Sequence, residues 1–183
     1  MITALSQKTR HKCFISYHKA DEAEVSKFVN TFDHAHDVFI SRGIGADMPG
    51  DIIGSDDRDY IMRQIRERYL TGSTVTISLI GRCTWARKFV DWELASTLRN
   101  DPKNRRSGLL GILLPSAYHT DGTYQVPPRL NDNLAGDHAY AALYRYPSSV
   151  DSLATMIDTA FNARQVEVPE NGRDLFSYNR QCP

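Results

Sequence analysis

The chain has 183 residues, of which 41% are hydrophobic, and its 22 Lys and Arg residues balance 22 Asp and Glu residues. This length and composition predict one globular domain with a sizeable core. A neutral chain without a long basic run gives no reason to expect nucleic acid or an anionic membrane as partner. No apolar run approaches the roughly 20 residues that span a bilayer, and the first residues lack a signal-peptide pattern. We therefore expect a cytoplasmic protein.

The cysteine and histidine pattern argues against a disulfide framework and against a metal site. Cys13, Cys83 and Cys182 are odd in number and form no C-x-x-C pair, which is typical of a reduced cytosolic protein. His34 and His36 lie two residues apart, with no third ligand at a metal-binding spacing. The sequence predicts three free thiols and no bound metal.

Strand and helix patterns alternate along the chain, which is typical of an α/β fold with a parallel sheet. Strands are predicted at residues 12–18, 37–41, 73–80, 109–114 and 138–146. Helical spacing of apolar residues follows four of them, and the third predicted helix covers residues 86–99. We expect a flavodoxin-like three-layer sandwich with a five-stranded, mainly parallel sheet in the order 2-1-3-4-5. The single domain covers residues 1–163, and residues 164–183 form a C-terminal tail.

Three local features refine this outline. Asp21 and Glu24 have the spacing of a capping box at the start of the first helix, and Ser148 or Ser149 can cap the last helix. Residues 115–137 are rich in Pro, Gly, Asn and Asp. A loop this long and polar is predicted to lie outside the core, where it could serve as a lid or a contact surface.

The expected sheet order places a ligand site beyond the carboxyl ends of strands 1 and 3. Ser16, Tyr17 and His18 stand at the first of these ends, and Arg82 follows the second. Several familiar signatures are absent: the sequence has no G-x-G-x-x-G after strand 1, no Walker A motif and no G-x-S-x-G elbow. A phosphoacceptor receiver domain would need carboxylates at the end of strand 1, where this chain has none.

Residues 81–93, GRCTWARKFVDWE, run from this end of strand 3 into the third helix. Phe89 and Glu93 are four residues apart, so they share a helix face at the border of the buried stripe. Glu93 would then be a half-desolvated carboxylate beside an aromatic ring. Periodicity alone favours a structural interpretation: Glu93 as an edge acid of an amphipathic helix, Trp85 and Trp92 as packing residues, and Arg82 as a solvated charge.

Two motifs resemble those of a known family. CFISYHKAD, at residues 13–21, is similar to the opening motif of TIR domains. Residues 55–98 resemble the TIR-like domain of Thoeris antiphage defence proteins, in which an I-x-x-x-I-R helix precedes S-x-V-T-I-x-L-I-G, a threonine and a W-V-D-W-E-like helix. The resemblance covers residues 12–114 by motif and residues 115–161 by pattern.

The resemblance implies a flavodoxin-like fold and an NAD⁺-consuming activity that depends on a glutamate in helix 3, the position of Glu93. NAD⁺ is then a substrate, and no cofactor is implied. Ser16, Tyr17 and His18 would line the pocket, Arg82 could meet the diphosphate, and Trp85 and Phe89 would flank it. The family usually has Trp where this chain has Phe89.

In Thoeris systems the TIR protein senses phage infection and makes a cyclic or conjugated ADP-ribose signal that activates a separate effector. The resemblance therefore implies a phage-derived trigger, an effector reached through a diffusible nucleotide, and self-association, because catalytic TIR domains often build a composite site from two protomers. Two alternatives stay open: a non-catalytic TIR interaction module, and a nucleoside deoxyribosyltransferase-like enzyme, whose motifs are not seen here.

Overall fold

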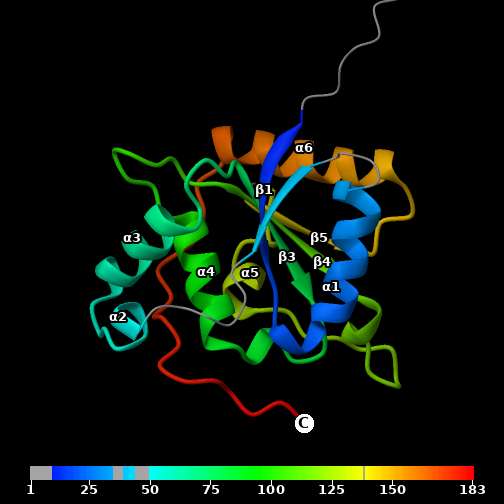
Figure 1. The fold of residues 1–183 in the computed structure, drawn as a ribbon, viewed down its shortest axis with the longest axis horizontal. Coiled ribbons are helices and arrows are strands. Elements are labelled where there is room, and N and C mark those ends of the chain that lie inside the picture. The colour runs from blue at the N-terminus through cyan, green and yellow to red at the C-terminus, as the bar shows by residue number, and fades with distance from the viewer. Residues whose placement is uncertain (1–9, 35–38, 44–49, 138) are drawn as a thin grey trace, which may run out of the picture.

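A central parallel sheet organises the protein (Figure 1). The computed structural model describes residues 10–34, 39–43, 50–137 and 139–183. The strands lie in the order β2-β1-β3-β4-β5, and all four neighbouring pairs are parallel. Their bounds are β1 His11–Ser16, β2 Phe39–Gly43, β3 Val75–Ile80, β4 Gly108–Leu113 and β5 Ala141–Arg145. The predicted α/β class with a parallel, flavodoxin-like sheet is confirmed.

Helices cover both faces of this sheet. On one face lie α1 (Glu22–Val29) and α6 (Val150–Val166); on the other lie α3 (Arg58–Arg68), α4 (Lys88–Leu98) and the short α5 (Pro128–Asn131), with α2 (Gly50–Ile53) beside α3 (Figure 1). The described residues also form short helical segments: η1 (Lys19–Asp21), the π-helical η2 (Asn30–His34), η3 (Thr84–Ala86) and η4 (Pro115–Ala117).

Alternation along β1 assigns its side chains to two cores. Cys13 and Ile15 pack with α1 and α6, whereas Phe14 packs with α3 and Trp92 of α4. Successive strand residues point to opposite faces, so Ser16 shares the face of Phe14 and is directed toward α4. β3 and β4 are buried along their whole length, as the apolar runs in their sequences predict.

Several predicted details are changed by tertiary contacts. Two residues of the expected second strand, 37 and 38, lie outside the described residues, as do His36, residue 138 and residues 44–49 of the loop that follows β2. The third predicted helix is slightly shorter than expected: Ala86 ends η3, and α4 begins at Lys88 and ends at Leu98. Ser149 caps α6 in a capping box with Ser152. The predicted capping box at Asp21 is wrong, because its side chain does not cap α1.

Residues 115–137 are only in part the solvent-exposed loop that their composition predicts: residues 120–125 and 135–137 are exposed, whereas Arg129 and Leu130 of α5 are buried. Arg129 of α5 is 1% exposed and pairs with Asp91 of α4, through Nε to Oδ1 at 2.9 Å and Nη2 to Oδ2 at 3.2 Å. Leu130 is buried in the core beneath α4. The prediction of a segment outside the core is therefore wrong for α5, because a polar residue can be buried when a partner satisfies its charge.

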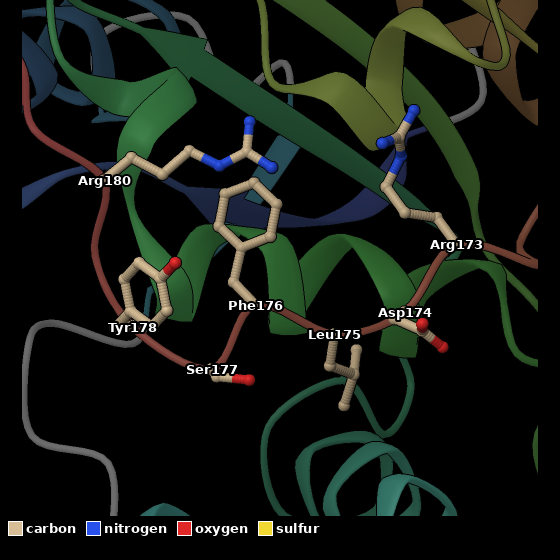
Figure 2. A pocket seen from close by; sticks show the side chains of 7 residues that line it. All are labelled: Arg173, Asp174, Leu175, Phe176, Ser177, Tyr178 and Arg180. Atoms are coloured by element: carbon tan, nitrogen blue, oxygen red, sulfur yellow. The ribbon is translucent and has the colours of Figure 1, made fainter.

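The C-terminal segment, residues 167–183, runs along α4 after α6 ends (Figure 1). Arg129 donates to the backbone oxygens of Arg173 and Asp174 at 3.0 and 3.1 Å. Trp92 Nε1 donates to the Phe176 oxygen at 2.9 Å, and the Asn179 side chain accepts from the first amide of α4. Figure 2 shows this segment crossing α4, with the Arg180 guanidinium over the Phe176 ring, 4.1 Å from its centre.

A disulfide joins Cys83, just before η3, to Cys182 near the end of the chain, with their Cα atoms 5.6 Å apart. The prediction of three free thiols is therefore wrong for this pair, while Cys13 is free and buried. Sequence spacing did not reveal the bridge, because the two cysteines are 99 residues apart and meet only when the C-terminal segment packs on α4.

The buried Asp91–Arg129 pair generates a stability prediction. Arg129→Ala leaves the Asp91 carboxylate buried without its cation, so we expect the free energy of unfolding to fall by about 3–5 kcal/mol. Urea denaturation followed by circular dichroism measures the loss. The matched control is Arg173→Ala, which breaks a partly exposed ion pair with Asp132 and should change stability by at most about 1 kcal/mol. Equal losses for both variants would contradict the argument.

The disulfide generates a second prediction. Because it closes a long loop, Cys182→Ser should lower the free energy of unfolding by about 2–4 kcal/mol. Reduction of the wild-type protein with a dithiol should cause a similar loss, whereas the variant should be insensitive to the reductant. Thermal melts with and without reductant provide the measurement, and a wild-type melt that reductant leaves unchanged would refute the prediction.

Candidate active site

Ser16 and Glu93 meet at the point where the strand order reverses between β1 and β3. Ser16 is the last residue of β1 and pairs in register with Ser78 of β3. Its Oγ donates a hydrogen bond to Glu93 Oε2 at 2.6 Å, and both residues are buried. A buried carboxylate thus stands at the topological switch point, where sheets of this kind bind ligands.

Glu93 is more deeply buried than its helical position predicts. Val90, Leu94 and Leu98 face the core as expected, but every residue from Val90 to Leu98 is buried and Glu93 is only 3% exposed. The expectation of a half-desolvated carboxylate is wrong, because α3, α5 and the C-terminal segment cover the remaining sides of α4. Helical periodicity identifies the residues that face the sheet, but it does not predict that other segments pack on the remaining faces of the helix.

Burial controls the protonation of this site. Removal from water raises the pKa of Glu93 from 4.5 to about 8, and the hydrogen bond from Ser16 opposes that rise. The carboxyl is therefore mainly protonated near neutral pH in the conformation described. An acid whose pKa is strongly raised by its surroundings is a frequent mark of a functional site.

A second polar network connects the loops that leave β1 and β3. Thr84 Oγ1 donates to Asp21 Oδ2 at 3.1 Å and accepts from the Gly81 amide at 2.9 Å. Burial raises the pKa of Asp21, and the Thr84 hydrogen bond opposes this effect. A Cβ atom at Gly81 would come within 2.3 Å of the Asp21 carboxylate, so any larger residue here would displace that carboxylate.

The sequence analysis predicted that Asp21 caps a helix, and it predicted no partner for Thr84. The signal that was available is that Asp21 closes the CFISYHKAD motif and that Gly81 and Thr84 lie in the second motif. Motif residues from two distant segments are expected to meet when both follow strands that pair in parallel. The network therefore links the segment that follows β1 to the segment that follows β3.

A family model describing the TIR-like domain of the Thoeris protein ThsB matches residues 14–119. The chain belongs to this family. The match spans more than half of the chain and includes Ser16, Asp21, Thr84 and Glu93. Membership indicates a role in antiphage defence. The comparison with curated proteins finds no match.

The other site residues predicted for the TIR-like domain have varied surroundings. Tyr17 and His18 are half-buried; burial raises the pKa of Tyr17, with the charges of Glu22 and Glu93 adding to it, and burial lowers that of His18. Tyr17 thus lies within electrostatic reach of Glu93.

Arg82, Trp85 and Phe89 are not joined to Glu93 by a described contact. Exposed Arg82 contacts His119 Nδ1 through Nη2 at 3.1 Å, and Phe89 packs edge-on against Trp92, with 5.8 Å between ring centres. Trp85 lies in η3, next to the disulfide. Their predicted roles in substrate binding remain predictions.

Two further properties concern the described part of the TIR-like chain. Residues 10–34, 39–43, 50–137 and 139–183 contain no group of three or more His, Cys, Asp or Glu side chains arranged to hold a metal ion. Within the same ranges, no helix has the length and apolar character needed to cross a membrane.

The raised pKa of Glu93 predicts how stability changes with pH. The unfolded chain releases this proton near pH 4.5 and the folded chain near pH 8. Raising the pH between these values therefore favours unfolding, by up to about 1.4 kcal/mol per pH unit. Glu93→Gln should remove this component, so its melting temperature should decline less from pH 5 to 8 than that of the wild type. Exposed Glu67→Gln serves as control and should follow the wild type.

Proposed function

We propose that this TIR-like domain cleaves the nicotinamide–ribose bond of NAD⁺ and makes an ADP-ribose-derived, cyclic or conjugated, signal that activates a separate effector during phage infection. The observation that carries the proposal is the buried Ser16–Glu93 hydrogen bond at the switch point of the sheet. It lies within the part of the chain that matches the family model.

The chemistry asks for one well-placed carboxylate. When the bond between the ribose C1′ and the nicotinamide nitrogen breaks, its electron pair leaves with nicotinamide and positive charge develops on the ribose. An ionised Glu93 beside that ring would stabilise the charge, and a site closed to water would strengthen the attraction. Attack of water at C1′ gives ADP-ribose and a proton; attack by a group of the same molecule gives a cyclic product.

The burial of Glu93 bears on how the activity is controlled. A side chain that is 3% exposed cannot contact a substrate until its surroundings move, and a carboxyl with a pKa of about 8 stabilises a cation poorly while it is protonated. We propose that self-association in response to a phage-derived trigger opens the site and ionises Glu93. In the untriggered protein, raising the pH through about 8 ionises Glu93 and thereby favours the open site, so nicotinamide release should increase. After the trigger has opened the site, this increase should be absent.

The same burial favours a second candidate function. Because α4 is covered on every side, the hydrogen bond between Ser16 and Glu93 can have a purely structural role. The domain would then be a non-catalytic interaction module. The two candidates differ in one measurable property, since only the enzyme releases nicotinamide from NAD⁺.

The experiment incubates the full chain with NAD⁺, alone and in lysate from phage-infected cells, and follows nicotinamide and nucleotide products by mass spectrometry. We expect release by the wild type and Glu67→Gln, and a loss of at least about 100-fold in Glu93→Gln, typical of removing a key electrostatic group. Thermal melts establish that each variant is folded. Release that survives in Glu93→Gln would refute the role of Glu93. A folded wild type without turnover in either condition would favour the interaction module.

A further inference from the structure

A cavity rich in arginine lies at the opposite end of the sheet from Glu93. It measures about 580 Å³ and is lined by Asn100, Arg105, Arg106, Arg164 and Gln165. The first three belong to the loop between α4 and β4, and the other two to the last turn of α6. Because this loop precedes β4, the cavity is at the amino ends of the strands. A six-residue strand spans roughly 20 Å, so the cavity and the switch point are separate.

Two of the three lining arginines are held in place by backbone oxygens. Arg106 Nη2 donates to the Glu167 oxygen at 2.9 Å, and Arg164 Nη1 donates to the Thr74 oxygen at 3.3 Å. The Arg164 guanidinium also lies over the Phe161 ring, 4.2 Å from its centre. A guanidinium has five N–H donors, so each of these bonds leaves further donors for another molecule. These contacts orient the two side chains and leave some of their N–H donors available to a ligand.

The third lining arginine, Arg105, is exposed and has no hydrogen-bond or ion-pair partner among the residues that the structure describes. Its positive charge adds to burial in lowering the pKa of Arg164. The acidic residues nearest in sequence, Asp101 and Glu167, do not line the cavity. Asp101 Oδ1 instead accepts the backbone amides of Lys103 and Asn104.

A fourth guanidinium, which does not line the cavity, is within electrostatic reach of Arg164. Arg66 of α3 is 2% exposed and donates to Ser107 Oγ at 3.0 Å, while its Nε has no hydrogen-bond partner. Burial lowers the pKa of Arg66 to about 10; the charge of Asp101 opposes this effect, and the charge of Arg164 adds to it. The neutrality of the whole chain therefore conceals a local excess of positive charge, which is assembled from three separate segments.

We infer that this cavity binds a small molecule carrying a diphosphate or a longer phosphate chain. Arginine forks match the geometry of phosphate oxygens, and a multiply charged phosphate would offset several guanidinium charges at once. The volume falls within the range of about 300–1,000 Å³ that is usual for small-molecule sites. The site does not involve Glu93, so its ligand need not be the substrate of the proposed reaction.

Isothermal titration of the full chain with pyrophosphate, ADP and inorganic phosphate tests the inference. We expect pyrophosphate and ADP to bind more tightly than inorganic phosphate, since more charge meets the arginines. Tighter binding of ADP than of pyrophosphate would identify a nucleotide as the preferred source of the diphosphate. Glu93→Gln should bind like the wild type, which separates this test from that of the proposed function.

Variants of the loop decide whether the cavity is responsible. Arg105→Gln removes a lining charge that makes no described contact, so the protein should fold normally and bind pyrophosphate at least about tenfold more weakly. Lys103→Gln removes the same charge from the same loop but outside the cavity, and should change the affinity less than about twofold. Arg164→Gln provides a second lining variant, with a thermal melt to show that it is folded.

Three outcomes would overturn the inference. One is the absence of binding by any of the phosphate compounds at about millimolar concentration and low ionic strength. Another is an equal loss of affinity in Arg105→Gln and Lys103→Gln, which would indicate a diffuse electrostatic effect. The third is binding of a nucleic acid oligomer in the absence of any binding of pyrophosphate or ADP, which would make the arginines part of a macromolecular surface.

Discussion

The buried ion pair between Asp91 and Arg129 is the interaction on which the arrangement of the candidate site depends. Both oxygens of Asp91 accept from Arg129, and one also accepts the Phe176 amide at 2.9 Å. Arg129 in turn donates to the C-terminal segment. Two buried charges are stable only when nearly all of their hydrogen-bonding capacity is used. This requirement fixes α4, α5 and residues 167–183 as one packed unit.

The depth of Glu93 follows from that unit. With the sheet on one side and the C-terminal segment, α3 and α5 on the others, α4 has no solvent-exposed face along most of its length. Ser16 supplies the one side-chain hydrogen bond described for Glu93, and burial holds the proton on the carboxyl. Under the proposed function, the resting domain stores its catalytic acid in a neutral, closed form. Activity would then depend on a change in packing, as is common for sites controlled by assembly.

The two ends of the sheet differ in chemistry. The carboxyl ends gather hydroxyl and carboxyl groups, at Ser16, Glu93, Asp21 and Thr84, whereas the amino ends gather guanidinium groups around the cavity beside Arg105. The helix α4 connects them, because Glu93 lies in its middle and the loop of the arginine cavity follows its last turn. Acidic and hydroxyl groups at one end of the sheet and guanidinium groups at the other indicate two places for polar ligands.

The sequence by itself determined the alternation of strands and helices, the parallel α/β class, the family and the identity of Glu93 as the residue of interest. These rest on short-range patterns: apolar runs in β3 and β4, helical spacing in α1, α4 and α6, and two local motifs. Tertiary structure alone decided the burial of Glu93, the contact of Asp21 with Thr84, the Cys83–Cys182 bridge and the insertion of Arg129 into the core. The physical reason is that each of these joins segments far apart in the chain, and a polar residue shows its burial only when its partner is in place.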